Sequence, residues 1–210
     1  MKKIWLLGIF LSIVACNGQK EKTNKTEKKQ ILKKQTMEKF DIISFNKHQE
    51  NGEWNYTDNE GNKYRDWKDF DRGYVQEIKN KKNIFDIYKY FHIDGVLAQE
   101  GIEFHGGGFN NGIWKDYNEK GEITKQVDYD IPYKNYPWEK VEAYLQSRKV
   151  DLKDNFTRVW REENNEGTFW MISWDAEKLS NIGTKTINNI VIDVKTGKVI
   201  KEYTTIYKDN

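Results

Sequence analysis

Few side chains in this sequence have the types and spacing that chemistry requires. The chain of 210 residues holds three histidines, His48, His92 and His105, and one cysteine, Cys16. These residues are far apart in sequence, whereas structural zinc sites take four Cys or His ligands in closely spaced pairs. The sequence therefore predicts no metal site.

A serine hydrolase would need more than the one fragment of its machinery that is present. His105-Gly106-Gly107-Gly108 has the letters of the oxyanion motif of lipases and esterases. That chemistry also requires a nucleophilic serine in the pattern Gly-x-Ser-x-Gly. The serines beyond the N-terminal segment all lack flanking glycines: Ser44, Ser147, Ser173 and Ser180. We interpret the run as a glycine-rich hairpin loop ahead of Trp114.

Acidic residues give no stronger site. Asp116 begins a segment like a calcium-binding loop, but Lys120 occupies its fifth position and Val127 its twelfth, where a carboxylate is required. Two pairs of acids could be imagined as hydrolase carboxylates, namely Asp128 with Asp130 and Glu162 with Glu163. Acids that alternate in an aromatic strand more often form a solvated face. The sequence predicts no catalytic residue, metal ligand or cofactor.

The clearest chemistry is a modification at Cys16. Residues 1–15 have a positive start at Lys2 and Lys3 and then an apolar run, as a secretory signal does. The run is about half of the ~20 residues that a membrane-spanning helix needs. Ile13-Val14-Ala15-Cys16 resembles the lipobox of bacterial lipoproteins. The resemblance implies cleavage before Cys16 and anchoring to membrane lipid through acyl chains on that residue, which would leave no thiol for a disulfide.

The resemblance also places the mature chain in the cell envelope. Asn17 follows Cys16, and it is not the aspartate that retains lipoproteins at the inner membrane in some diderm systems. We therefore expect the outer membrane rather than the inner one.

Charge is distributed unevenly along the mature chain. Residues 17–36 carry seven lysines and two glutamates, a net charge of +5, with almost no apolar residues. We expect residues 16–36 to form the lipidated cysteine and a disordered tether, because such a composition cannot offset its ordering entropy. Residues 37–210 carry 26 basic and 31 acidic side chains, a net charge of −5. That charge gives no support to nucleic-acid binding and favours a basic protein partner.

Residues 37–131 contain a recurring pattern in which an aromatic residue is followed seven positions later by glycine. The three copies are Trp54 to Gly61, Tyr88 to Gly95 and Trp114 to Gly121. The pattern predicts β-hairpins, with each glycine supplying a positive φ in the turn. The segment 111–123 resembles the MORN-variant repeats of a bacterial group described as toxin–antitoxin-like. Glycine spacings of 34 and 26 residues depart from the more even period of that family.

Residues 132–210 predict a helix followed by an antiparallel meander. Pro137 suits the first position of a helix, and Trp138, Val141, Tyr144 and Leu145 then share one apolar face. Strands are expected at 157–162, 168–174, 186–194 and 199–207, with Gly197 in the last turn. The segment 190–199 resembles the end of a PepSY-type domain, a helix-plus-strand family of secreted proteins associated with protease inhibition.

Several aromatic residues have two interpretations each. Trp160, Trp170 and Trp174 could form an exposed platform for a glycan or peptide, but the period-two spacing of Trp170 and Trp174 favours core packing. Trp67, Phe70 and Tyr74 are spaced three and four apart, which suggests one helical turn capping the repeats, but we prefer the interpretation that these side chains simply fill the core.

These patterns together predict an α+β fold that is mostly antiparallel β. For function we expect a membrane-anchored envelope lipoprotein that acts as a non-enzymatic protein-interaction module, of the immunity or inhibitor type. The alternative is an envelope hydrolase or glycan-binding lipoprotein that uses exposed aromatic side chains. Exposed tryptophans around a cleft with two carboxylates would favour the alternative, and a flat acidic or apolar patch would favour the first hypothesis.

Replacing Cys16 with Ser should abolish lipidation. The Cys16→Ser chain should remain an uncleaved or soluble precursor, because the acyl acceptor is lost. Metabolic labelling with a fatty-acid probe, followed by membrane flotation, measures both effects. A variant that still incorporates the probe and still floats with membranes would show that the lipoprotein interpretation is wrong.

Overall fold

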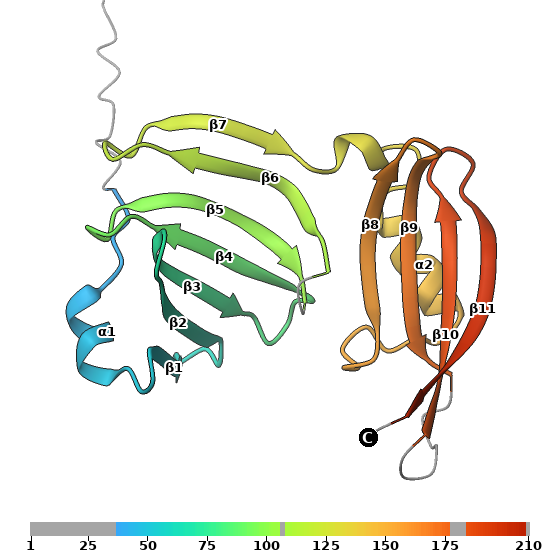
Figure 1. Cartoon of the computed structure of the whole chain (residues 1–210), viewed down its shortest axis with the longest axis horizontal. Helices are drawn as coiled ribbons and strands as arrows, with labels where there is room; N and C mark the ends of the chain where they lie inside the picture. Colours follow the sequence, from blue (N-terminus) through green and yellow to red (C-terminus); the bar gives the residue numbers. More distant parts are fainter. Residues whose placement is uncertain (1–36, 106–107, 177–183, 209–210) are drawn as a thin grey trace, which may run out of the picture. The chain divides into compact units, whose positions relative to one another are not determined.

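The computed structural model describes residues 37–105, 108–176 and 184–208, and within them the fold is α+β and mostly antiparallel β, as the sequence predicts. The strands form two antiparallel sheets (Figure 1). No helix in this described part is both long and apolar enough to cross a membrane. The signal sequence and the tether predicted at residues 1–36 lie outside the described residues.

The first sheet is a meander of seven strands in sequence order, preceded by the short helix α1 (Ile42–His48). Its strands are β1 (Glu53–Thr57), β2 (Lys63–Asp69), β3 (Gly73–Lys79), β4 (Phe85–Phe91), β5 (Leu97–Phe104), β6 (Asn110–Tyr117) and β7 (Ile123–Asp128).

Helix α1 packs against one part of this sheet. Asp41 caps it by accepting a hydrogen bond from the Ser44 N–H at 2.9 Å. Phe40 and Phe45 pack against sheet residues in a small hydrophobic cluster. The helix is short, so this packing stabilises it more than its own propensity does.

The helical turn considered for Trp67, Phe70 and Tyr74 is not formed, and the preferred interpretation, core filling, is confirmed for Tyr74 but wrong for Phe70, which is 96% exposed. Trp67 lies in β2, Tyr74 lies in β3, and Phe70 lies in the loop that joins them. The chain reverses there because Asp69 accepts a hydrogen bond from the Asp71 N–H at 3.0 Å and Gly73 adopts a φ of +122°. The spacings of three and four residues come from two strands and the loop between them. A pattern of only three residues cannot distinguish this arrangement from a helical turn.

The three aromatic-to-glycine copies all form the same kind of hairpin turn. Gly61, Gly95 and Gly121 have φ values between +74° and +84°. Each glycine N–H donates to the carbonyl three residues earlier, at 2.8–3.1 Å. The positive φ predicted at these glycines, and at Gly197 with +68°, is found in the structure.

The first copy is nevertheless out of phase with the other two. The spacing of 34 residues spans three strands, from β1 to β4, whereas 26 residues span two, from β4 to β6. An odd number of strands places the turn of Gly61 at the opposite end of the meander. Trp54 pairs with Asp66, and Tyr88 pairs with Gly101, which puts Trp54 and Tyr88 on opposite faces of the sheet.

Only the last two copies are therefore equivalent, with Tyr88 and Trp114 on one face. Trp114 is buried, with 5% of its surface exposed, but Tyr88 is only partly buried. The Trp114 indole covers Gly101 of β5 and donates to the Ile102 carbonyl at 3.1 Å. A Cβ atom at Gly101 would lie 2.1 Å from the Trp114 ring, so glycine is required there.

The second sheet has the order β11-β10-β9-β8 and is covered on one face by helix α2. Its elements follow the short 3-10 helix η1 (Ile131–Tyr133), and they are α2 (Trp138–Ser147), β8 (Arg158–Asn164), β9 (Gly167–Asp175), β10 (Thr184–Asp193) and β11 (Lys198–Lys208). These bounds differ from the predicted ones by one or two residues at almost every end. Pro137 is the N-cap of α2 rather than its first residue.

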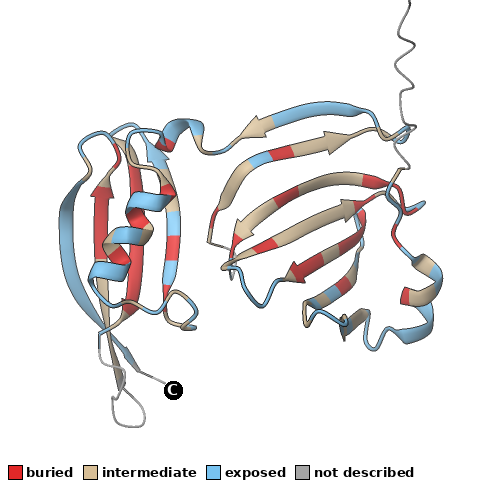
Figure 2. Ribbon diagram, turned by 180° about the vertical axis from the view of Figure 1, so that it is seen from behind, coloured by how far each residue is buried: buried red, intermediate tan, exposed pale blue. Residues whose placement is uncertain are grey.

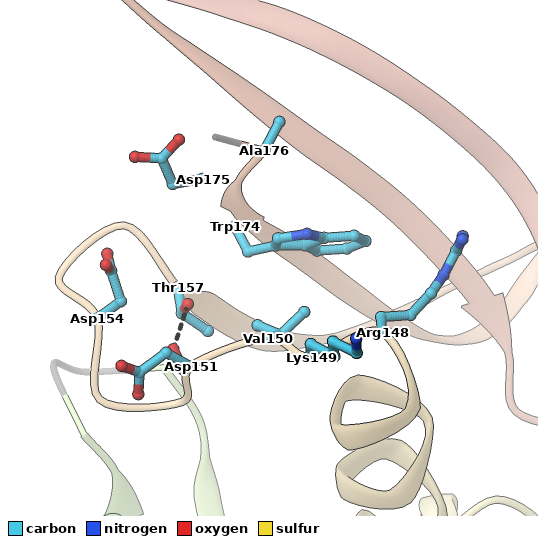
Figure 3. Close-up of a pocket in the computed structure, with 9 residues that line it drawn as sticks. All are labelled: Arg148, Lys149, Val150, Asp151, Asp154, Thr157, Trp174, Asp175 and Ala176. Carbon is cyan, nitrogen blue, oxygen red and sulfur yellow. Dashed lines mark hydrogen bonds between the residues drawn. The ribbon is translucent and has the colours of Figure 1, made fainter. Parts of the chain in front are cut away.

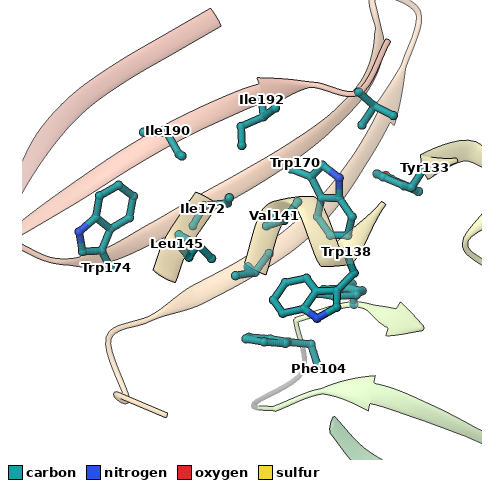
Figure 4. Packing of buried hydrophobic residues seen from close by; sticks show 13 residues of the cluster. Phe104, Tyr133, Trp138, Val141, Leu145, Trp170, Ile172, Trp174, Ile190 and Ile192 are labelled. Atoms are coloured by element: carbon teal, nitrogen blue, oxygen red, sulfur yellow. The ribbon is translucent and has the colours of Figure 1, made fainter. Parts of the chain in front are cut away.

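The core on this face follows from the alternation in β9. Trp170 and Ile172 are almost fully buried and Trp174 is 8% exposed, beneath Val141 and Leu145 of α2 (Figure 4). The preference for core packing of Trp170 and Trp174 is thus confirmed. Trp160 pairs with Met171, which places it on the other face, where it is 36% exposed. The three tryptophans do not form one platform.

One buried cation connects this core to the end of the first sheet. The Arg161 guanidinium of β8 lies 4.3–4.7 Å from the ring centroids of Phe109, Tyr133 and Trp170. It donates to the carbonyls of Asn110 and Tyr129 and binds Asp130 at 2.7 Å. Phe104 and Phe109, which precede the boundary predicted at 131/132, belong to the same hydrophobic cluster as α2 and β8–β10.

A double-mutant cycle tests the contact between Gly101 and Trp114. Gly101→Ala should destabilise the protein by about 1–3 kcal/mol through overpacking, and Trp114→Ala by about 3–5 kcal/mol through the cavity that it leaves. In the Trp114→Ala background the cost of Gly101→Ala should largely disappear, because the clashing ring is gone. Urea unfolding of the four proteins measures the coupling, and simple additivity of the two costs would contradict the contact.

Candidate functional site

The residues that resembled hydrolase parts have structural partners. His105 Nδ1 lies 3.0 Å from a carboxylate oxygen of Asp86. The Ser44 hydroxyl donates to Asp41, and the Ser147 hydroxyl donates to the Tyr144 carbonyl at a helix end. Gly106, Gly107 and Ser180 of the predicted set lie outside the described residues. None of these contacts places a serine hydroxyl beside a histidine and a donor for an oxyanion, as a serine hydrolase requires.

The segment like a calcium loop is a hairpin turn. Asn118 Oδ1 accepts hydrogen bonds from the N–H groups of Lys120 and Glu122 at 2.9 and 3.0 Å. Asp58 makes the same two bonds in the β1–β2 turn. Across the described residues, no three His, Cys, Asp or Glu side chains are placed to hold a metal ion.

The acid pairs considered from sequence also have other roles. Asp130 binds Arg161 and accepts a hydrogen bond from the Gly112 N–H at 3.1 Å, while Asp128 accepts one from the Asp130 N–H. Glu162 accepts a hydrogen bond from the Asn164 side chain at the β8–β9 turn. These contacts fix turns and strand ends.

Sequence analysis missed a group of carboxylates on the face of the first sheet that carries Tyr88. Asp86 of β4 pairs directly with Glu103 of β5, and Glu77 of β3 accepts a hydrogen bond from the Tyr88 hydroxyl at 2.8 Å. Glu77 and Asp86 are buried, with 4% and 2% of their surface exposed. The three acids come from three strands, so only the cross-strand register brings them together.

Burial and neighbouring negative charges raise the pKa values of two of these acids. Burial raises the pKa of Glu103, and the charges of Glu77 and Asp86 raise it further. Burial also raises the pKa of Asp86, an effect that the hydrogen bond from His105 partly offsets. Lys79 lies 3.1 Å from Glu77 and balances part of the charge. Like-charged residues directly opposite each other on neighbouring strands are destabilising, so the pairing of Asp86 with Glu103 has a cost in stability.

A further buried acid lies on the opposite face of the sheet. Asp66 of β2 is 2% exposed, and one of its carboxylate oxygens has no hydrogen-bond partner among the described residues. Burial raises the pKa of Asp66 to about 6, against hydrogen bonds with Gln76 and Tyr56 that lower it.

The second sheet has a cavity at the end of β9. A pocket of about 370 Å³ lies beside Trp174, between the segment 148–151 and the loop carrying Asp154 (Figure 3). Its charges are largely used by neighbours within the protein. Arg148 binds Glu202 at 2.6 Å, Asp175 binds Lys185 at 2.9 Å, and Asp154 accepts a hydrogen bond from the Phe156 N–H. The pocket therefore offers an indole wall but few uncommitted polar groups.

The most exposed apolar surface of the second sheet is its edge strand β11. Its exposed apolar residues are Val199, Ile200, Tyr203, Ile206 and Tyr207, with exposed fractions from 36% to 68%. Figure 2 shows the strand exposed along its length, next to the buried strands β10 and β9. In the described part of the chain β11 pairs only with β10, so its outer backbone edge has no partner strand.

Comparisons with protein-family models, with curated proteins and with solved structures each found no match to this chain.

The buried carboxyl of Asp66 should make stability depend on pH. The folded protein holds the proton more tightly than the unfolded chain, so stability should fall as pH rises from about 4 to about 6 and then level off. Asp66→Asn should reduce this dependence, with Asp86 and Glu103 supplying the remainder, and should be more stable than the unsubstituted protein at pH 7, by on the order of 2 kcal/mol. Urea unfolding between pH 4 and pH 7 measures both effects.

Asp71→Asn is the matched control, because Asp71 is exposed in the loop that follows the strand of Asp66. This variant should keep the pH profile of the unsubstituted protein. A profile for Asp66→Asn that retains the full loss of stability between pH 4 and pH 6 would show that Asp66 is not its source.

Proposed function

We propose that this chain is a lipoprotein of the cell envelope, anchored through acylated Cys16, and that its folded part is a non-enzymatic module that binds a protein. An immunity or inhibitor protein would act in this way. The anchor is supported by the lipobox-like sequence, which also favours the outer membrane through Asn17. The binding role is supported chiefly by one observation, the exposed apolar edge of β11.

An edge strand of this kind can accept an extended segment of a partner. Long, apolar edge strands offer a row of unpaired N–H and C=O groups, and natural proteins usually protect them. Strand addition would satisfy these groups, and side-chain contacts on the two faces would supply specificity. The alternating side chains Ile206 and Tyr207 would contact the added strand from opposite faces.

Charge would act at longer range. The strand itself carries Lys198, Lys201, Lys208 and Glu202, so its contact surface is not acidic. The net charge of −5 over residues 37–210 would instead steer a basic partner toward the protein, an effect that weakens as salt rises. The strand would then supply the contact that holds the partner.

A second function is favoured by the carboxylate face of the first sheet. Tyr88, Tyr90 and Trp67 lie on the same face as Glu77, Asp86 and Glu103. Aromatic side chains beside carboxylates are the arrangement expected of a glycan-binding or hydrolytic envelope protein. The acids already contact His105, Lys79 and Tyr88, which reduces their availability to a substrate. We therefore rank this function second.

Charged substitutions on β11 test the first function. Ile200→Lys with Ile206→Lys should remove capture of a protein partner from envelope extract, because an added strand would bury the new charges. Ile123→Lys is the matched control, since Ile123 is 49% exposed on β7, the edge strand of the other sheet. Circular dichroism checks that all variants are folded.

Capture should also decrease when salt is raised from low to high concentration. Equal capture by the β11 variant and the control would contradict binding at this edge. Hydrolysis of a peptidoglycan, ester or peptide substrate, without any captured protein, would favour the alternative function.

A further inference from the structure

One end of the seven-stranded sheet exposes large apolar side chains in its connections. In a meander, the connections β2–β3, β4–β5 and β6–β7 all lie at the same end (Figure 1). Phe70 of the first connection is 96% exposed, and Ile93 of the second is 71% exposed. Two large, mostly exposed apolar side chains on neighbouring loops are costly in water, whereas a singly exposed residue would need no explanation.

The two loops are in contact rather than merely on the same side. A Cβ atom at Gly73, which ends the β2–β3 loop, would lie 2.3 Å from the Phe91 carbonyl and 2.9 Å from the Ile93 nitrogen. Gly73 thus brings the chain after Phe70 directly against the start of the β4–β5 turn. Phe70 and Ile93 thus belong to two loops whose backbones are in close contact, and we call the end of the sheet formed by these connections the loop end.

The N-terminal segment reaches the described structure at this same loop end. A Cβ atom at Gly121, in the β6–β7 turn, would lie 2.8 Å from the Met37 sulfur. The Phe40 N–H donates to the Gly95 carbonyl of the β4–β5 turn at 2.8 Å, and the Leu97 N–H donates to the Glu38 carbonyl at 3.2 Å. The first described residues are therefore fixed to two of the three connections.

We propose that the loop end rests on the membrane, with Phe70 and Ile93 entering the interfacial region of the lipid. The inference depends on the proposed anchor at Cys16. About 20 residues separate Cys16 from Met37, and as a flexible coil they would span roughly 25 Å root-mean-square. The anchor keeps the loop end within that reach of the bilayer, so even weak insertion is favoured by a high effective concentration.

Apolar burial rather than charge attraction drives this contact. The three connections carry four acidic side chains, Asp71, Asp94, Glu119 and Glu122, and two basic ones, Arg72 and Lys120, a net charge of −2. Such a surface has no excess of basic residues to attract anionic headgroups. An aromatic ring and a branched aliphatic side chain instead gain free energy by leaving water at the interface. The contact should therefore depend weakly on salt.

Site-directed spin labelling of the lipidated full chain tests the proposal. Cys16 is acylated in the mature protein, so a cysteine introduced elsewhere is the only reactive thiol. Labels are placed by Phe70→Cys and Ile93→Cys, and at the opposite end of the sheet by Glu60→Cys and Lys82→Cys. All four positions are exposed, so the substitutions should not disturb folding. The proteins are reconstituted in vesicles of phosphatidylethanolamine and phosphatidylglycerol.

Labels at 70 and 93 should become accessible to oxygen, which partitions into lipid, and should lose accessibility to a water-soluble nickel complex. Labels at 60 and 82 should remain accessible to nickel, and raising the salt should change neither result. Flotation of the vesicles reports the anchor separately. A chain that does not float with the vesicles would contradict both the proposed anchor and the proposed docking.

A chain that floats while labels at 70 and 93 behave like those at 60 and 82 overturns the docking alone. Labels at 70 and 93 that lose both oxygen and nickel accessibility would also overturn it, since a protein surface rather than lipid would then cover them.

Discussion

The buried guanidinium of Arg161 is the interaction on which much of the structure depends. A charge with 9% exposure of its side chain is costly to bury unless it is paired and hydrogen-bonded. Here a carboxylate, two backbone carbonyls and three aromatic rings surround it. Desolvation still lowers the pKa of Arg161. Removing the guanidinium would take a hydrogen-bond donor from Asp130 and from two backbone carbonyls. The position of the segment 109–133 therefore depends on the position of strands β8 and β9.

The composition of this core helps to explain which apolar side chains remain exposed. The large aromatic side chains that surround Arg161, together with Trp138 of α2, fill the space between α2 and the second sheet. Most apolar residues of β8–β10 are used there, whereas β11 at the edge and the connections of the first sheet contribute little to it. Exposed apolar residues are therefore frequent on β11, although others, such as Trp160 and Ile131, lie close to the core.

Sequence patterns predicted the second sheet well and the first sheet only in part. Alternation in 168–174 and the apolar face from Trp138 to Leu145 are local signals, and both elements were found. The helical turn at Trp67, Phe70 and Tyr74 was wrong because three residues do not define a period. The phase of Trp54 and the grouping of Glu77, Asp86 and Glu103 depend on the number of strands between repeats and on cross-strand register. Neither property can be read from the sequence of a single segment. A shift of one residue in the register between two strands moves every side chain of a strand to the other face of the sheet.

The proposed anchoring and the proposed partner binding would use separate elements of the fold. The membrane contact would use Phe70 and Ile93 in connections of the first sheet, and the partner contact would use β11 of the second, with no residue in common. The charges are also separated along the sequence, with +5 over residues 17–36 and −5 over residues 37–210. A basic partner would therefore be attracted by residues 37–210 and repelled by residues 17–36, which favours its approach to β11 over its approach to the segment next to the proposed anchor.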